Sequence, residues 1–200
     1  MFSVGDKVMH CTHGAGIITE KKEMQITKTP RCYLVIQMLG SDSTLMIPID
    51  KAEQRLRPAR KEISLRQLLT DELASEPEKL PQDYKERTKH IESKLKSGET
   101  KKWIEIVRDL SHREEQGKLS SGDRRLLDRA IDLLSGELAL AQEIGQEQAK
   151  THLKSIVQRR GEITDRRVKS SNWWQTLGPR VMESLTKSRM DRAGDARQKS

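Results

Sequence analysis

The sequence has few cysteines and few aromatic residues, and it has no long apolar run. Its two cysteines, Cys11 and Cys32, cannot build a disulfide framework, which favours a reducing compartment. One Phe, two Tyr and three Trp are too few to line a deep ligand pocket, so an enzyme is not expected. No run approaches the roughly 18 apolar residues of a membrane span, and the first residues lack a signal-peptide pattern. We therefore expect a cytoplasmic protein without membrane association.

Charge is plentiful, but its excess is confined to one end of the chain. The net charge is +8, and residues 150–200 hold 13 Lys and Arg against 5 Asp and Glu, which leaves 25 of each sign elsewhere. A basic arm of this kind is typical of proteins that bind a polyanion, although many basic tails are only solvated. Within this arm Trp173 and Trp174 are compatible with docking to a partner or with capping a helical bundle.

Residues 1–58 have the pattern of short β-strands. "VGDKVMH", "AGIITEKKEMQI", "RCYLVIQML" and "TLMIPI" are rich in β-branched residues, and Gly or Ser turns separate them until Pro48. In the third segment Leu34, Ile36 and Met38 alternate with Tyr33 and Val35, as in a half-buried strand. Four or five strands in fewer than 60 residues predict a small, strongly bent sheet or barrel.

After Pro58 the apolar spacing becomes helical. We predict helices from Ser64 as N-cap, from Pro81 to Gly98, and from residue 99 to Gly117. Another opens with a capping box between Ser120 and Asp123, and a shorter one covers residues 146–160. The apolar positions behind these predictions are Leu65, Leu68, Leu69 and Leu73; Trp103, Ile106, Val107 and Leu110; and Leu127, Ala130, Leu134, Leu138 and Ala141.

Short glycine-marked links between these helices predict a small antiparallel bundle. The expected fold class is α+β, with a small Tudor-like or SH3-like barrel before a helical domain. We expect the barrel at residues 1–58, a helix and linker at 59–80, the helical domain at 81–160 and a basic, flexible tail at 161–200. A further short helix is predicted at residues 179–185.

The stretch "HCTHGAGII" at residues 10–18 is compatible with three kinds of site. His10, Cys11, His13 and Cys32 lack the spacing of a structural zinc site, and neighbours on a strand point to opposite faces. A phosphate-binding loop is disfavoured because no Lys-Ser/Thr and no helix follow. A cysteine–histidine catalytic dyad lacks an orienting partner. We favour a turn between two strands, with no metal and no cofactor.

Two aromatic residues differ in their surroundings. Trp103 lies within an apolar helical stripe, which favours a place in the core. Tyr84 has no such stripe, and Lys85, Arg87 and Lys89 follow it. An aromatic ring among basic residues is able to stack on or wedge beside bases, but an ordinary surface tyrosine is almost as good an interpretation.

Two long stretches together resemble one known family. "FSVGDKVMHCTHGAGII", followed by "YLVIQM" and "TLMIP", resembles the N-terminal domain of the bacterial CarD/CdnL transcription regulators, a domain shared with the transcription–repair coupling factor. "KSGETKKWIEIVRDLSHREEQGKLSSGDRRLLDRAIDLLSGELALA" resembles the helical domain of the same family. The likeness covers residues 1 to about 145, in the family's order.

The resemblance implies a Tudor-like barrel that binds the β subunit of RNA polymerase through a strand edge. It also implies a helical domain that contacts promoter DNA at the upstream edge of the −10 bubble and stabilises the open complex. The polymerase contacts would be Met24, Ile26, Lys28, Leu45, Met46, Ile47 and Pro48, and the DNA contacts Tyr84, Lys85, Arg87, Lys89, Arg124 and Arg125. The expected partners are RNA polymerase and promoter DNA, for a monomer associated with the nucleoid.

This chain departs from the family pattern at three places. His10-Cys11 stands where the family commonly has Tyr-Pro, Tyr84 stands at the wedge tryptophan, and Met24 and Met46 stand where some relatives have arginines. The alternative function is a general RNA- or ribosome-associated protein, which the lack of an aromatic row in the barrel segment disfavours. A metal-dependent enzyme built on residues 10–18 is a third hypothesis.

Overall fold

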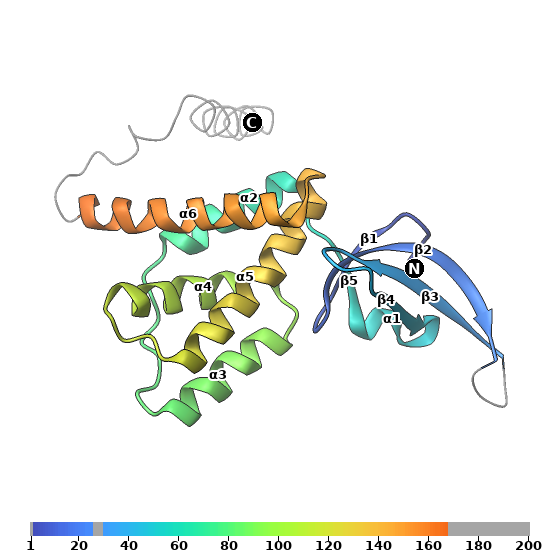
Figure 1. Ribbon diagram of the computed structural model, residues 1–200, viewed down its shortest axis with the longest axis horizontal. Helices are drawn as coiled ribbons and strands as arrows, with labels where there is room; N and C mark the ends of the chain where they lie inside the picture. The colour runs from blue at the N-terminus through green and yellow to red at the C-terminus, as the bar shows by residue number, and fades with distance from the viewer. Residues whose placement is uncertain (1, 26–29, 168–200) are drawn as a thin grey trace, which may run out of the picture. The chain divides into compact units, whose positions relative to one another are not determined.

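The N-terminal part of the computed structural model is an antiparallel sheet (Figure 1). The structure describes residues 2–25 and 30–167. Within these residues the sheet has five strands in the order β4-β3-β2-β1-β5, so β4 and β5 are its two edges. The strands are β1 (Lys7–His10), β2 (Gly14–Met24), β3 (Arg31–Met38), β4 (Thr44–Pro48) and β5 (Leu56–Pro58), and α1 (Ile49–Arg55) connects β4 to β5.

The predicted half-buried alternation along β3 is confirmed only in part, because Tyr33 and Val35 on its other face are buried as well, at 8% exposure each. Leu34, Ile36 and Met38 lie in the core of the sheet domain, together with side chains from β1, β2, β4, α1 and β5. Between β2 and β3 the register shifts after the pair Ile18–Ile36, which places a β-bulge around Thr19. A bulge increases the local twist, which lets five short strands bend around one small core.

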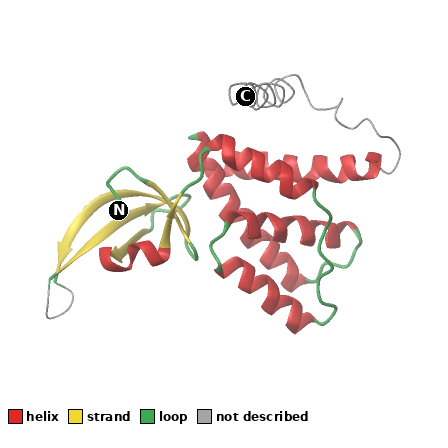
Figure 2. Cartoon of the chain, turned by 180° about the vertical axis from the view of Figure 1, so that it is seen from behind, coloured by secondary structure: helices red, strands yellow, loops and turns green. Residues whose placement is uncertain are grey.

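The short helix α1 was not predicted. Its seven residues follow Pro48 directly, and it contacts β3, β4 and β5. Figure 2 shows it as the one helix that lies among the strands. Ala52 is its one buried residue, so the sequence offers no apolar stripe from which to predict a helix.

The remaining described helices pack around one large core, which also includes α2, a helix that we expected in a linker segment before the helical domain. The core gathers Leu65, Trp103, Leu110, Leu127 and Leu134, all of them buried. Trp103 is fully buried and donates its indole N–H to the carbonyl of Leu95 at 3.1 Å, which confirms its core role. The helices are α2 (Glu62–Ala74), α3 (Tyr84–Lys96), α4 (Thr100–Glu115), α5 (Ser121–Gln142) and α6 (Gln146–Arg167).

Several helix ends agree with the sequence signals. Ser120 and Asp123 form a reciprocal capping box at the start of α5, as predicted. Gly98 and Gly117 have φ angles of +73° and +67°, as expected of glycines that end α3 and α4. In the predicted stripe of α5, Ala141 is half-buried and the other four positions are buried.

Three predicted helix boundaries are wrong. α2 begins at Glu62, before the predicted cap Ser64. α3 begins at Tyr84 rather than at Pro81, because the Asp83 carboxylate accepts the backbone N–H of Glu86 at 2.9 Å and so takes the N-cap. α6 continues to Arg167, beyond the predicted end at residue 160. Trp173, Trp174 and the helix predicted at 179–185 lie outside the described residues.

The sheet and the helices share apolar contacts. Met9 of β1 and Ala15 of β2 belong to the core of the helical domain rather than to that of the sheet. A Cβ atom at Gly136 would lie only 2.9 Å from the Ala15 side chain, so β2 and α5 approach closely at a residue without a side chain. In the described part of the chain, no helix is long and apolar enough to cross a membrane.

Candidate nucleic-acid and partner interfaces

The stretch at residues 10–16 contains the turn between β1 and β2, which is formed by residues 11–13. His10 is buried, and its Nδ1 accepts the backbone N–H groups of Thr12 and His13 at 3.0 and 3.1 Å. Burial, together with the nearby His13 and Arg55, lowers the pKa of His10 to about 4. The neutral ring therefore organises the turn, since a protonated Nδ1 is unable to accept these bonds.

Two glycines complete this turn. Gly14 has a φ of +89°, a conformation that L-residues with side chains rarely adopt. A Cβ at Gly16 would lie 2.6 Å from the side chain of Ile36 and 2.9 Å from the carbonyl of Gln37. Among the described residues, no three His, Cys, Asp or Glu side chains are grouped to hold a metal ion. The geometry is that of a tight turn.

The outer face of the sheet carries an apolar row that ends at a free strand edge. Val35 lies opposite Met46, and Tyr33 lies opposite Pro48, so these four side chains share one face. We call them the outer row. Tyr33 and Val35 are buried and Pro48 is half-buried, so Met46, at 45% exposure, is the exposed member of the row. Within the described residues β4 has a neighbour on only one side. An edge with unpaired backbone groups beside apolar side chains is suited to bind an added strand.

The other predicted polymerase contacts differ from one another in how far their side chains are exposed. Ile47 is 2% exposed and belongs to the core of the sheet domain. Leu45 and Met24 are half-buried, the latter at the end of β2. Ile26 and Lys28 lie outside the described residues. The structure thus brings Leu45, Met46 and Pro48 together on one edge strand, while Ile47 is able to offer only its backbone.

Tyr84 is exposed but closely supported. It is the first residue of α3, and its side chain is 49% exposed. A Cβ at Gly122, near the start of α5, would lie 2.3 Å from the Tyr84 hydroxyl and 3.0 Å from its ring. On another side the guanidinium carbon of Arg87 is 5.8 Å from the ring centroid. The ring therefore rests on the backbone of α5 and is presented to solvent from a fixed place.

Arg87 lies inside the domain, whereas the predicted phosphate contact requires an exposed guanidinium. It is 4% exposed, and its Nε donates to Asp123 at 3.0 Å. It also donates to the carbonyls of Pro81 and Gln82, at 2.9 Å each. Burial alone would raise the pKa of Asp123, but the hydrogen bonds from Arg87 and Ser120 outweigh it and lower that pKa. The sequence offered no signal for this pair because its members lie far apart along the chain.

The other predicted DNA contacts are exposed basic side chains. Lys85 and Lys89 lie one turn apart on α3 and have no ion pair with any described residue. Arg125 near the start of α5 is likewise exposed and unpaired within the described part. Arg124 is exposed too, but it forms an ion pair with Glu114 at 2.5 Å. Lys85, Lys89 and Arg125 are thus three unpaired positive charges among the described residues. They lie in the first turns of α3, which carries Tyr84, and of α5, on which the Tyr84 ring packs.

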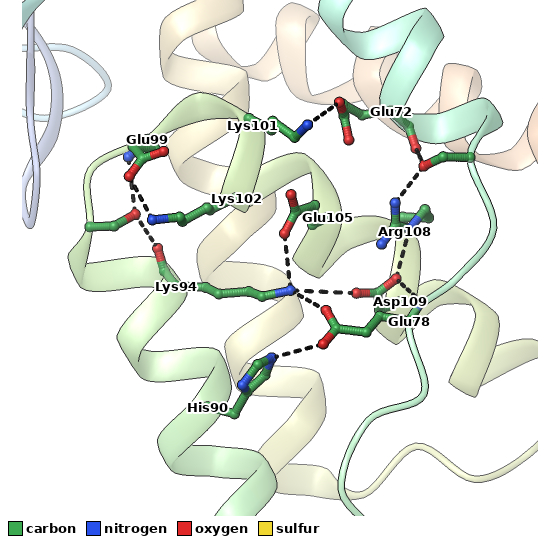
Figure 3. Close-up of polar contacts among 12 residues, drawn as sticks. Glu72, Glu78, His90, Lys94, Glu99, Lys101, Lys102, Glu105, Arg108 and Asp109 are labelled. Atoms are coloured by element: carbon green, nitrogen blue, oxygen red, sulfur yellow. Dashed lines mark hydrogen bonds and ion pairs between the residues drawn. The ribbon is translucent and has the colours of Figure 1, made fainter.

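A polar network fixes the second half of α3 against its neighbours (Figure 3). The Lys94 ammonium contacts Glu78 at 2.6 Å and Glu105 at 3.0 Å, and it lies 4.0 Å from Asp109. Burial alone would lower the pKa of Lys94, but its bonds to Glu78 and Glu105 raise it overall. Because Glu78 lies in the linker before α3 and Glu105 lies on α4, this lysine ties both to the helix that begins with Tyr84.

The comparisons with known proteins match both domains. The family model of the CarD-like/TRCF RID domain matches residues 2–60, and that of the CarD C-terminal domain matches residues 68–154. A curated relative from Bacillus subtilis (strain 168), named "Putative transcription factor YdeB", is 32% identical over 152 residues. The match covers 76% of this chain and 99% of the relative. The chain belongs to the CarD/CdnL family.

Proposed function

We propose that this chain is a transcription regulator that binds the β subunit of RNA polymerase through its sheet domain and stabilises open promoter complexes through its helical domain. Regulation of transcription is supported by the family and by the name of the B. subtilis relative. The proposal implies action by binding, without catalysis, in the cytoplasm beside the chromosome.

The polymerase contact is assigned to the free edge of β4 and the outer row. The edge supplies backbone hydrogen-bonding groups, and Met46 supplies exposed apolar surface next to them. The four side chains of the outer row are uncharged, and on the same face the exposed Lys22 lies opposite Tyr33 and Glu20 lies opposite Val35, so charges of both signs border the row. We therefore assign the contact mainly to strand pairing and apolar burial. An interface of this composition is expected to respond weakly to salt.

The DNA contact is assigned to Tyr84 with Lys85, Lys89, Arg124 and Arg125. The single observation that carries it is the supported, half-exposed Tyr84 ring on the backbone of Gly122. A ring held in place loses little side-chain entropy when it stacks on a base exposed at the edge of the bubble. Such stacking is available in the melted state and absent in the closed one, so binding shifts the equilibrium toward the open complex. The basic segment after residue 160 is assigned additional phosphate contacts.

Replacing Tyr84 tests the proposal. Tyr84→Ala is expected to shorten the lifetime of open complexes roughly tenfold relative to the unsubstituted protein, since stacking on a base contributes about 1–3 kcal/mol. Tyr84→Phe keeps the ring and serves as the matched control with a near-normal lifetime. Tyr84→Trp offers more surface and is expected to lengthen it. The lifetime is measured by resistance of the complexes to a heparin challenge.

Binding to the polymerase must be measured beside the lifetime. It is expected to be the same for all three variants, because Tyr84 lies on the helical domain and far from β4 in the chain. An open-complex lifetime unaffected by Tyr84→Ala would contradict the assignment. Affinity capture from a bacterial lysate distinguishes the proposed function from the alternative one. Recovery of polymerase core supports the proposal, whereas recovery of ribosomes instead supports an RNA- or ribosome-associated role.

A further inference from the structure

A buried ion pair joins the sheet domain to the helical domain. Arg57 of β5 donates two parallel hydrogen bonds to Glu137 of α5, with Nη1–Oε1 at 2.6 Å and Nη2–Oε2 at 2.8 Å. The side chain of Glu137 is fully buried, and that of Arg57 is 28% exposed. The two residues are 80 positions apart, so nothing local in the sequence indicates the pair.

Three further segments converge on the same pair. The Glu137 carboxylate also accepts the backbone N–H of Arg60 at 3.0 Å and the hydroxyl of Thr100 at 2.9 Å. The Nε of Arg57 donates to the carbonyl of Gly98 at 2.7 Å, and its guanidinium carbon lies 5.2 Å from the Trp103 ring centroid. Each oxygen of the Glu137 carboxylate therefore accepts two hydrogen bonds, and each guanidinium nitrogen of Arg57 donates at least one, as a buried ion pair needs to be tolerated.

The apolar contacts between the sheet and the helices do not depend on direction, whereas the hydrogen bonds of the Arg57–Glu137 pair do. Met9 and Ala15 bury apolar surface among the helices, and apolar burial is favourable in many relative orientations. A bidentate bond between a guanidinium and a carboxylate requires one geometry. Buried ion pairs contribute little net stability compared with apolar residues of the same size, so directionality is the property that distinguishes this one.

We propose that Arg57 and Glu137 are positioning residues that fix the orientation of the helical domain relative to the sheet domain. This orientation lets a partner on β4 and DNA on Tyr84 be bound in one geometry, a consequence that rests on the proposed function. The pair contacts neither partner and acts through the placement of the two surfaces.

The test compares a variant without the pair with a matched control. Arg57→Met with Glu137→Met removes both charges and leaves apolar side chains of similar length, so no charge is buried alone. The control is Glu143→Gln, which caps the C-terminal end of α5 and also binds the sheet domain, through Lys7 at 2.7 Å. Its side chain is 78% exposed, so the control removes a solvated pair at the end of the same helix.

The first measurement reports orientation and does not depend on transcription. Spin labels are placed on Cys32, which is exposed on β3, and on Asp71→Cys, which is exposed on α2, in a Cys11→Ser background. We expect one narrow distance distribution in the parent protein and in the Glu143→Gln control. The distribution is expected to broaden in the double methionine variant, while circular dichroism confirms that both are folded. An equally narrow distribution in the double variant would overturn the proposal.

Arg57→Lys provides a second route if the double variant does not fold. Lysine keeps the positive charge but makes a single, rotatable contact in place of the two parallel bonds. The expected distribution is broader than in the parent protein. A distribution identical to that of the parent in the folded Arg57→Lys variant would show that the bidentate geometry is not what fixes the orientation.

The second measurement compares the affinities for polymerase and DNA with the lifetime of the open complex. Affinities for polymerase and for duplex DNA, measured one at a time, are expected to remain at the parent value in the double variant. The open-complex lifetime is expected to fall to that of polymerase alone. A parent-like lifetime would overturn the functional consequence. If the parent protein itself fails to lengthen the lifetime, the proposed function fails, and the distance distributions still decide whether the pair fixes orientation.

Discussion

The two candidate surfaces, one around the edge of β4 and one around Tyr84, are supported by different kinds of side chain. The outer row and the edge of β4 rest on an apolar core, and their shape follows from strand pairing. The surface around Tyr84 rests on ion pairs: the buried pair of Arg87 with Asp123 beneath the ring, and the partly exposed cluster of Lys94 with Glu78 and Glu105 further along α3. An apolar support tolerates many small substitutions, whereas a charged support fails when one partner is removed. The proposed DNA-binding surface is therefore expected to be the more easily destabilised of the two.

Breaking the charged support is expected to have the largest effect. Arg87→Ala leaves the fully buried Asp123 without its closest cation, which costs about 3–5 kcal/mol of unfolding free energy for a buried pair. Arg124→Ala is the control, because its pair with Glu114 is exposed and is worth less than about 1 kcal/mol. Urea unfolding at neutral pH measures both. Equal, small losses in the two variants would show that Asp123 finds another partner.

Acid is expected to weaken the sheet domain through His10. Its pKa is about 4 in the folded protein and 6.5 in the unfolded chain, so folding favours the neutral ring. The stabilisation is complete above pH 6.5, decreases as the pH falls toward 4 and is absent below it, a loss of roughly 2–3 kcal/mol. His10→Gln keeps a hydrogen-bond acceptor that does not titrate, so its unfolding free energy should vary less over this range. Parallel pH profiles for the two proteins would contradict the role of His10.

Charging the outer row tests the apolar surface directly. Met46→Glu places a carboxylate at the centre of the proposed polymerase contact and is expected to weaken polymerase binding about tenfold, as for a moderate interface hot spot. Ile63→Glu, which charges an exposed apolar side chain on α2, away from β4 in the chain, is the matched control. DNA binding by the chain alone should not change in either variant. Unaltered polymerase affinity in Met46→Glu would remove the outer row from the interface.

The smallest expected effect distinguishes the surfaces by salt. Lys89→Ala removes one unpaired charge from the helix that begins with Tyr84, so the slope of log affinity for DNA against log salt should decrease by about one. Lys96→Ala, whose side chain is paired with Glu92 on the same helix, should change the slope less. Titrations of labelled duplex DNA at several salt concentrations measure the slopes. The same slope for the parent and both variants would place DNA elsewhere on the chain.

The sequence predicts those features whose causes are local. The capping box of Ser120 with Asp123 spans three residues, and the apolar stripe of Trp103 follows one helix. α1 has no stripe, and β5 is a three-residue strand that exists only by pairing with β1, so neither leaves a local pattern. The same limit explains Arg87. Its run of basic neighbours resembles an exposed patch, and only the folded chain brings Asp123 to it.

Both buried pairs involve the same helix, α5. Asp123 at its start meets the Arg87 that underlies Tyr84, and Glu137 meets the Arg57 of the sheet domain. Fourteen residues separate these carboxylates, which is four turns of helix and about 21 Å along its axis. The spacing between the two proposed contact surfaces therefore depends on the number of residues in this part of α5. Deletion of seven residues from this interval would keep both carboxylates near their original faces while drawing the two surfaces about 10 Å closer together.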